Sequence, residues 1–234
     1  MKRSRHIRLH GPAGVDPREL VDLVAAARLV CFPTDTVYGV GGVVTPVVRE
    51  ALLAAKRRDA AKPLQLIYSS RRLLEVSLEL GPHVLEAVRR LLPGPLTLLV
   101  PYPPGLTFPP PGEVRHGLPG PPGAGECRVA TLGVRAPAWP ATAQALAGLP
   151  FPLLASSANP SGGRAPRSVD EVEAGLLAAC DLVLDAGPVS GTASTIVDLS
   201  LFETERSWRI LRPGTVDGRD VAALLDGDRE ESQG

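Results

Sequence analysis

Small hydrogen-bonding side chains follow an apolar run of the sequence at residues 153–155. The segment 155–166 reads ASSANPSGGRAP, so Ser156, Ser157 and Asn159 come directly after the run and a glycine pair follows them. Asn-Pro and Gly-Gly dipeptides are typical of turns. Hydroxyl and backbone donors brought together are also typical of a cradle for an anion. The residues alone leave both interpretations open, and the turn is the more common.

Other polar residues stand at the ends of apolar runs elsewhere in the chain. They carry hydroxyl, carboxylate and guanidinium groups: Thr34, Asp35, Thr36, Tyr38, Thr131, Arg135, Ser194 and Arg212. An open α/β sheet presents its ligand-binding residues at such strand ends. Arg135 stands in the otherwise apolar run TLGVRAP, where a guanidinium is costly unless it is paired or faces a ligand. We expect Arg135 to hold a carboxylate with two nitrogens, which a lysine cannot copy.

A basic cluster, KRRDAAKP, supplies Lys56, Arg57, Arg58 and Lys62 at the end of a helix and in the turn that follows. Each of these cations taken alone is explained by the helix dipole and a solvated surface. Together with the strand-end residues they offer cationic and hydroxyl groups to anionic oxygens, with no evident nucleophile. This combination indicates a site that positions phosphates and carboxylates.

Several common kinds of site are excluded by the sequence. It contains no GxxxxGK[ST], HExxH or GxSxG motif. Its three cysteines, Cys31, Cys127 and Cys180, are far apart, so we expect reduced, mostly buried thiols in a cytoplasmic protein and no metal site made by the protein alone. Lys and Arg number 25, as do Asp and Glu, so no net charge draws the chain to nucleic acid or membrane. No apolar run is long enough to span a bilayer.

Apolar runs of strand length alternate with amphipathic runs of helical length. Helices are predicted at 16–29, 46–58, 71–80, 83–92 and 169–180. Asp16, Thr45 and Ser168 are the expected helix caps. Strands are predicted at 29–35, 63–68, 95–102, 131–137, 150–156, 181–187, 194–199 and 208–214. This alternation, with several strands in succession near the end, predicts an α/β fold with a mixed sheet flanked by helices.

Residues 101–127 interrupt the alternation. They are too rich in Pro and Gly to pack as a regular element, so we expect a Pro/Gly-rich loop inserted between two core strands. Such a loop can be mobile in the free protein and can close over a site when substrates bind. The acidic tail 226–234 is expected to fray. Residues 1–234 are thus predicted to form a single domain.

Motifs spread over residues 15–215 carry a resemblance to a known family. They read, in order, PTDTVYGVGG, KRR…KPL, LPGPLTLLV, TLGVRAPAWP, SSANPSG, STIVD and LRPG. In this order they resemble the motif series of the YrdC-like family in its short, single-domain form. The resemblance implies a twisted mixed α/β sheet with a concave basic cavity. It also implies the activity of an L-threonylcarbamoyladenylate synthase, which is a nucleotidyltransferase.

By this resemblance, L-threonine and bicarbonate form a carbamate that attacks the α-phosphate of ATP and releases pyrophosphate. The product would serve the threonylcarbamoyladenosine modification of tRNA. The implied partners are therefore ATP, L-threonine, bicarbonate and the downstream tRNA threonylcarbamoyl-transfer proteins, with a weak contact to tRNA. Mg²⁺ would enter with ATP, and no prosthetic group is implied. The chemistry needs alignment and neutralisation of charge more than a protein nucleophile.

The resemblance also implies roles for single residues. Threonine or its carbamate is expected to contact Thr36, Arg135, Ser157 and Ser194. ATP is expected to contact Arg58, Lys62, Thr131, Asn159, Arg167 and Arg212. Lys56 and Arg58 are the best candidates for cations that act on the reacting groups.

Three residues depart from the family's usual pattern. Asp35 stands where the family usually has Glu, and we expect the shorter carboxylate to be tolerated. Trp139 stands where His is common, which changes the expected rim of the cavity. Ile67 stands where some members place a His that helps to bind the substrate.

Two alternative functions remain open at this point. One is a related carbamoyl-adenylate chemistry, as in the YrdC-like domain of hydrogenase-maturation carbamoyltransferases, which are much larger and carry zinc-finger-like cysteines. The other is an RNA-binding module whose basic cavity holds a nucleic-acid backbone. The neutral overall charge and an aromatic content of 4% argue against the RNA-binding module.

Overall fold

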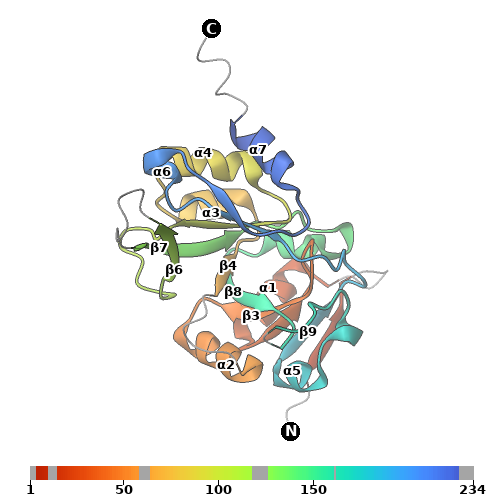
Figure 1. The fold of residues 1–234 in the computed structure, drawn as a ribbon. Helices are drawn as coiled ribbons and strands as arrows, with labels where there is room; N and C mark the ends of the chain where they lie inside the picture. The colour runs from red at the N-terminus through yellow and green to blue at the C-terminus, as the bar shows by residue number, and fades with distance from the viewer. Residues whose placement is uncertain (1–3, 10–14, 58–63, 118–125, 161, 227–234) are drawn as a thin grey trace.

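A mixed sheet runs through the whole molecule. The computed structural model describes residues 4–9, 15–57, 64–117, 126–160 and 162–226. Within them, eleven strands form one sheet in the order β1-β9-β2-β3-β8-β4-β7-β5-β10-β11, and β6 pairs with β7 beside this path. Figure 1 shows α3, α4, α6 and α7 at one end of the molecule and α1, α2 and α5 at the other. The predicted α/β class, a mixed sheet flanked by helices, is confirmed.

The strands are short, and their bounds are as follows: β1 Arg5–Arg8, β2 Val30–Phe32, β3 Gly39–Val43, β4 Gln65–Ile67, β5 Leu96–Pro101, β6 Gly112–Gly117, β7 Glu126–Arg135, β8 Leu153–Ser157, β9 Leu182–Asp185, β10 Thr195–Asp198 and β11 Arg209–Arg212. The α-helices are α1 Pro17–Ala26, α2 Pro46–Lys56, α3 Arg71–Ser77, α4 Pro82–Leu91, α5 Ala174–Ala179, α6 Phe202–Glu205 and α7 Gly218–Asp226. Two 3₁₀ helices are η1 Ala141–Gly148 and η2 Val169–Glu171.

Parallel and antiparallel pairs alternate in the centre of the sheet. β4 pairs antiparallel with β8 and parallel with β7, which in turn pairs antiparallel with β5. The register sets Gln65 opposite Gly133 on one side and Ala155 on the other. This register brings residues from three distant parts of the chain onto one row across the sheet.

Polar side chains begin the first two α-helices, as the sequence predicts. Asp16 Oδ1 accepts hydrogen bonds from the backbone N–H groups of Arg18 (2.9 Å) and Glu19 (3.1 Å). Thr45 Oγ1 accepts one from the N–H of Val48 at 3.2 Å. Each cap satisfies helix donors that would otherwise lack a partner, and such a cap contributes about 1 kcal/mol.

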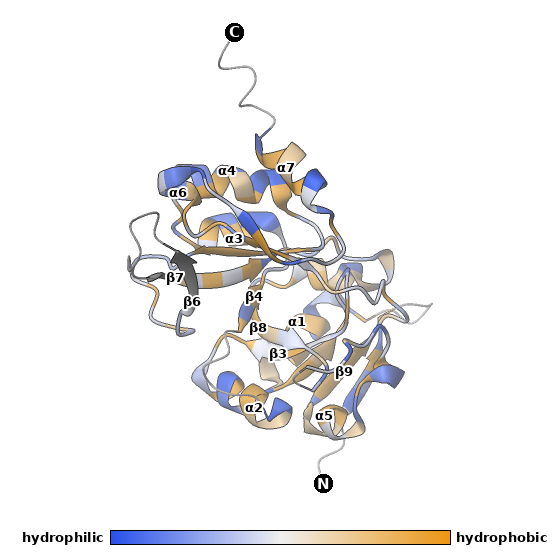
Figure 2. Cartoon of the chain, viewed as in Figure 1, coloured by the Kyte–Doolittle hydropathy of each residue, from blue (hydrophilic) through white to orange (hydrophobic). Residues whose placement is uncertain are grey.

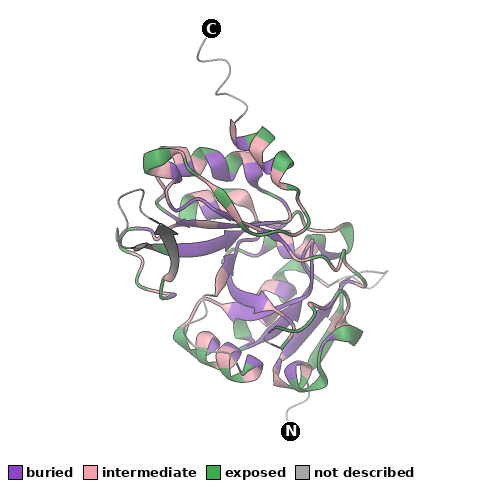
Figure 3. Cartoon of the chain, viewed as in Figure 1, coloured by how far each residue is buried: buried purple, intermediate pink, exposed green. Residues whose placement is uncertain are grey.

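The two faces of the sheet belong to two separate hydrophobic clusters. In β4, Leu66 belongs to the larger cluster and Ile67 to the smaller one. In β8, Leu154 belongs to the larger cluster, whereas Leu153 and Ala155 belong to the smaller one. Neighbouring residues of a strand point to opposite faces, so this division follows from the period of two. Figure 2 shows apolar residues on the sheet-facing sides of the helices, and Figure 3 shows that the central strands are buried.

The prediction that residues 101–127 form a loop is wrong for part of that stretch, whereas residues 102–111 are irregular as predicted. Residue 101 ends β5, residues 112–117 form β6, and β7 begins at residue 126. β6 contains no proline, and it pairs antiparallel with β7 along its whole length. Proline content predicts poor packing only where the prolines stand, and here the partner strand supplies the backbone hydrogen bonds. Residues 118–125 lie outside the described residues, and the closing movement of this loop stays a prediction.

The helix predicted at 169–180 is interrupted. Residues 169–171 form η2, Val172 has extended backbone, and the α-helix begins only at Ala174, after its N-cap residue Glu173. The predicted cap by Ser168 is also wrong, because its side chain makes no capping hydrogen bond. Most of the predicted tail, 227–234, lies outside the described residues, while Asp226 is the last residue of α7.

Two of the cysteines agree with the expected buried, reduced thiols. Cys31 and Cys180 are free and buried, and burial raises the pKa of Cys180 to about 12. Burial also raises the pKa of Cys31. Among the described residues, no helix combines the length and the hydropathy that a membrane crossing requires.

Candidate functional site

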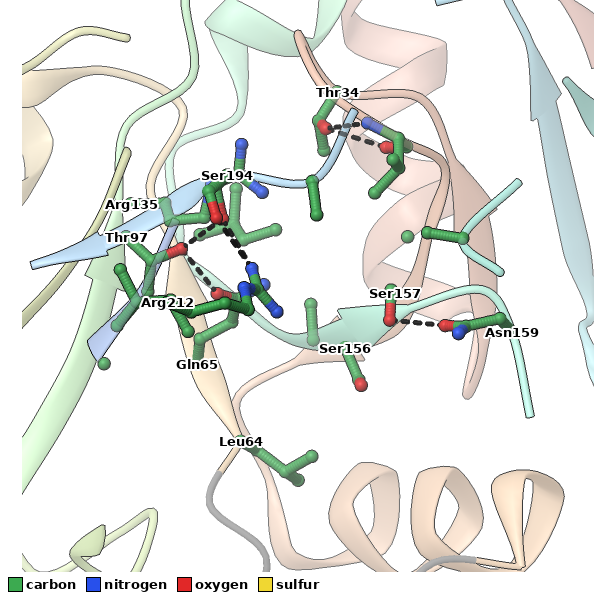
Figure 4. A pocket seen from close by; sticks show the side chains of 18 of the residues that line it. Thr34, Leu64, Gln65, Thr97, Arg135, Ser156, Ser157, Asn159, Ser194 and Arg212 are labelled. Carbon is green, nitrogen blue, oxygen red and sulfur yellow. Dashed lines mark hydrogen bonds between the residues drawn. The ribbon is translucent and has the colours of Figure 1, made fainter. Parts of the chain in front are cut away.

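A cavity of about 440 Å³ lies against one face of the sheet (Figure 4). Its wall contains alternate residues of neighbouring strands: Gln65 and Ile67 of β4, Thr97 and Leu99 of β5, Thr131, Gly133 and Arg135 of β7, Ala155 and Ser157 of β8, and Ser194 and Ile196 at the start of β10. The intervening residues, such as Leu66, Val134 and Leu154, pack into the larger hydrophobic cluster on the other face. The period of two thus separates most of the cavity wall from the larger cluster, although Ser156 of β8 also lines the cavity.

The charge of the described lining is positive. Arg135 and Arg212 both line the cavity, and no carboxylate does so among the residues that the structure describes. Hydroxyl groups and one carboxamide from β4 surround the two guanidiniums. A concave cavity of this composition suits a ligand that carries negative charge.

Arg135 is the buried cation of the cavity. Its Nη2 donates to Asp35 Oδ1 at 2.7 Å and to Thr36 Oγ1 at 2.9 Å. The other carboxylate oxygen of Asp35 accepts the backbone N–H of Ala138 at 3.0 Å. Because both N–H bonds of Nη2 are used inside the protein, the predicted two-nitrogen hold on a carboxylate is not available through this nitrogen.

Burial and charge act in opposite directions on this ion pair. Burial raises the pKa of Asp35, while the guanidinium of Arg135 and the N–H of Ala138 oppose this rise. Burial lowers the pKa of Arg135, the Asp35 carboxylate raises it, and the charge of Arg212 lowers it further. A guanidinium keeps its proton in proteins, so Arg135 carries its positive charge in this pair.

The connection between β2 and β3 is fixed by hydroxyl groups. Thr34 Oγ1 donates to the carbonyl of Val37 at 2.7 Å and accepts the N–H groups of Thr36 and Val37, both at 3.2 Å. Such a side-chain turn holds the connection without a helix or strand. Thr36 is fully buried, and Thr34 rather than Thr36 lines the cavity.

Arg212 enters the cavity from the edge strand β11. Its Nη2 donates to the carbonyl of Ser194 at 2.8 Å and to Ser194 Oγ at 3.2 Å. Ser194 Oγ also lies 2.8 Å from Thr97 Oγ1, and Thr97 Oγ1 donates to Gln65 Oε1 at 3.3 Å. A chain of hydrogen bonds therefore runs across β11, β10, β5 and β4, and Figure 4 shows it on one side of the cavity.

The segment after β8 is both a turn and part of the cavity wall. The N–H of Gly163 donates to the carbonyl of Pro160 at 3.0 Å, and the side chain of Asn159 donates to the carbonyl of Gly163. Ser157 Oγ donates to Asn159 Oδ1. Ser157, Asn159 and Gly163 all line the cavity, so the segment is a turn that also forms part of the cavity wall, and its role as a cradle for an anion stays a prediction.

Lys56 reaches the same strand from another side. It is 5% exposed, and its Nζ donates to Ser156 Oγ at 2.8 Å and to the carbonyl of Ser157. It lines a second hollow of about 460 Å³, together with Arg57 and Asn159. Asn159 lines both spaces, whereas Lys56 does not line the first.

The structure brings most, not all, of the predicted site residues into the first cavity. The lining includes Thr131, Arg135, Ser157, Asn159, Ser194 and Arg212. Thr36 lies behind Arg135, and Arg167 is exposed and pairs with Glu171 at 3.2 Å instead of lining the cavity. Arg58 and Lys62 lie outside the described residues.

Thr97 and Gln65 line the cavity although they were not predicted to bind a ligand. Each is a polar residue in an apolar strand, and that signal was available in PLTLLV and PLQLIY. Ile67 lines the cavity on the same strand as Gln65, two residues away. Trp139 does not line it, and its indole N–H donates to the carbonyl of Ser69 at 2.7 Å. The described residues contain no cluster of His, Cys, Asp and Glu that could hold a metal ion.

Most of the chain matches the sequence model of one protein family. Residues 22–214 match the family model of Sua5, YciO and YrdC, which carries the description "Telomere recombination". The chain belongs to the Sua5/YciO/YrdC family. This family is the one that the sequence motifs resemble.

Relatives with assigned names span most of the chain. A protein of Chromohalobacter salexigens, named threonylcarbamoyl-AMP synthase, is 35% identical over 80% of this chain and 96% of its own length. A protein of Mycobacterium leprae, to which the same name is given provisionally, is 35% identical over 89% of this chain and 88% of its own.

A solved structure gives the same fold. The crystal structure of Pyrococcus abyssi Sua5 complexed with L-threonine superimposes with a TM-score of 0.67 at 27% identity. The match covers 94% of this chain and 59% of the Pyrococcus chain, so this chain spans less than two thirds of that protein.

Proposed function

We propose that this protein is a threonylcarbamoyl-AMP synthase, which makes threonylcarbamoyl-AMP and pyrophosphate from L-threonine, bicarbonate and ATP. The observation that carries the proposal is one cavity lined by two guanidiniums and several hydroxyls, with no carboxylate in its described lining. Membership of the family and the names of the relatives support it. The L-threonine in the Pyrococcus abyssi Sua5 structure supports it for the amino acid substrate.

The reaction has two bond-forming steps. The amino nitrogen of threonine forms a C–N bond with bicarbonate, and water leaves to give the carbamate. A carbamate oxygen then attacks the α-phosphorus of ATP, and the bond from that phosphorus to the pyrophosphate oxygen breaks. Negative charge gathers on the phosphate oxygens during the attack, so fixed cations and donors lower the barrier.

The cavity offers donors for each part of the substrates. We assign Arg135, Ser157 and Ser194 to threonine or its carbamate, and Thr131, Asn159 and Arg212 to ATP. Arg135 and Ser157 lie on the wall of one cavity, and Asn159 follows two residues after Ser157. Thr36 would act through Arg135, to which it is hydrogen-bonded.

Three further assignments rest on the sequence motifs. Arg58 and Lys62 would bind the phosphates of ATP, and Arg167 would do so from the exposed rim. Lys56 would add positive potential through β8, where its ammonium contacts Ser156 and Ser157.

Magnesium would arrive as part of the MgATP substrate. The described residues do not form a metal site of their own, so the phosphates of the nucleotide would supply its ligands. The product is a mixed anhydride and therefore a reactive acyl donor. It would pass to cytoplasmic tRNA threonylcarbamoyl-transfer proteins, and the protein would make a weak contact with tRNA.

The test is product analysis of the purified protein with ATP, L-threonine, bicarbonate and Mg²⁺. Mass spectrometry should detect threonylcarbamoyl-AMP, and pyrophosphate release should require threonine and bicarbonate together. Equal release with either one omitted would refute the proposal. A thermal shift by ATP and threonine separates the enzyme from an RNA-binding module, which would respond to RNA instead.

A further inference from the structure

The carboxylate of Asp35 contacts the site from behind the cavity wall. Its Oδ1 accepts a hydrogen bond from Arg135 and its Oδ2 accepts one from the N–H of Ala138. The side chain of Asp35 is 9% exposed and that of Arg135 is 3% exposed. One carboxylate therefore joins the β2–β3 connection to the end of β7 and to the segment after it.

The hydrogen-bond donors of Arg135 are not all used in the same way. Nη2 has two N–H bonds, and Asp35 and Thr36 accept them. Nε is buried and has no hydrogen-bond partner among the described residues. A buried donor without a partner is unfavourable and rare in native proteins. Arg135 belongs to the cavity wall, so the orientation that Asp35 and Thr36 give to its guanidinium sets how this charge meets a ligand.

We propose that Asp35 is a positioning residue for substrate binding. It holds Nη2 of Arg135 and so fixes the orientation of the guanidinium, which then donates to one anionic oxygen of the substrate. The identity of that oxygen, in the carboxylate or carbamate of L-threonine, rests on the proposed function. Asp35 itself does not contact the substrate in this arrangement.

The charge of Asp35 allows a clear test. Removing this charge makes the cavity more positive, which alone would strengthen the binding of an anion. Removing it also frees the guanidinium to rotate, which weakens binding because the donor is no longer held in place. The positioning role requires the second effect to prevail.

The experiment compares wild type with Asp35→Asn and Asp35→Glu. The ¹⁵N–¹H signal of Arg135 Nε, assigned with Arg135→Lys, reports the exchange of this proton with water. We expect exchange at least tenfold faster in Asp35→Asn, and a Kd for L-threonine at least tenfold higher by calorimetry. Asp35→Glu retains the carboxylate and should stay within threefold of wild type in both measurements.

Asp198→Asn is the matched control. Asp198 is also a buried carboxylate paired with an arginine, since its Oδ2 accepts from Arg209 Nε at 3.0 Å, but it does not line the cavity. This variant should bind threonine as wild type does. A threonine Kd for Asp35→Asn within twofold of wild type, or tighter, overturns the proposal.

Two further outcomes also have a definite meaning: a variant that does not fold, and a wild type without synthase activity. If Asp35→Asn does not fold, the threonine titration of wild type decides, because an Nε signal that does not shift overturns the proposal. The exchange rate is measured without substrate, so it tests the positioning of Arg135 even if wild type makes no threonylcarbamoyl-AMP. If wild type makes no threonylcarbamoyl-AMP, the proposed function is refuted, while the positioning of Arg135 by Asp35 is still decided by the exchange rate.

Discussion

Gly214 lies against the backbone that carries Ser194 into the cavity, and replacing it by alanine should disturb both folding and binding. A Cβ at this position would lie 2.3 Å from the carbonyl oxygen of Ala193, 2.5 Å from the carbonyl carbon of Ser194 and 2.6 Å from the nitrogen of Thr195. These are backbone atoms, so no side chain can rotate away. Gly214 is not among the residues with positive φ, so the effect is steric rather than conformational.

The magnitude follows from the closeness of these contacts. Inserting a methyl group into well-packed structure costs about 1–3 kcal/mol or more. For a chain of this size, that corresponds to a fall in Tm of roughly 2–12 °C. Relief of the clash must move the 193–195 segment, and Ser194 is hydrogen-bonded to both Thr97 and Arg212. The affinity for threonine should therefore fall along with stability.

Gly148→Ala is the matched control for this prediction. No atom lies within 4 Å of a Cβ built at Gly148, so this alanine should leave stability unchanged or raise it by about 0.4–1 kcal/mol through the unfolded chain. Urea denaturation gives the free energy of unfolding for both variants, and calorimetry gives the threonine Kd. A Gly214→Ala protein within about 0.5 kcal/mol of wild type, the usual range for harmless surface changes, would refute the packing argument.

Two other predictions concern ion pairs. Arg135→Lys should lose about 1.5–3 kcal/mol of threonine binding, the value of a hydrogen bond to a charged group, and an unchanged affinity by calorimetry would assign Arg135 to structure alone. Glu75→Gln tests a surface pair, because hydrogen bonds and charge from Arg89 hold the pKa of Glu75 below its ordinary value. A carboxyl group with a lowered pKa stabilises the fold at pH values above its ordinary pKa, and this stabilisation is lost as the pH falls and the group is protonated. Glu75→Gln should therefore lower the free energy of unfolding by less than about 1 kcal/mol at pH 7 and leave it unchanged in strong acid. Urea denaturation at both pH values checks this, and an equal cost at both would contradict it.

The strand-end residues could be placed from the sequence because strands have a simple period. In TLGVR, Thr131 and Arg135 alternate with the apolar Leu132 and Val134, and the structure places the first pair on the cavity and the second in the core. The same rule would have found Thr97, which was not predicted. The rule states which side chains share a face, but not which face is open.

The strand at 112–117, inside the stretch predicted as a loop, was missed because pairing between strands is not local. Nothing inside residues 112–117 states that they will meet β7, and their neighbours are rich in proline. Strand formation depends on the partner more than on intrinsic preference. A composition rule applied to the whole stretch therefore hid a short segment without proline.

The contact between Asp35 and Arg135 shows what sequence reasoning could not supply. The two residues are 100 positions apart, and strands β3, β8 and β4 lie between β2 and β7 in the sheet. The expectation that a lone Arg in an apolar strand must be paired or face a ligand was sound, because a buried guanidinium without either is costly. The structure shows the pairing, since Nη2 is bonded to Asp35, while Nε has no partner among the described residues. The ligand contact of Arg135 stays a prediction, because only coordinates show which nitrogens of a guanidinium the protein itself occupies.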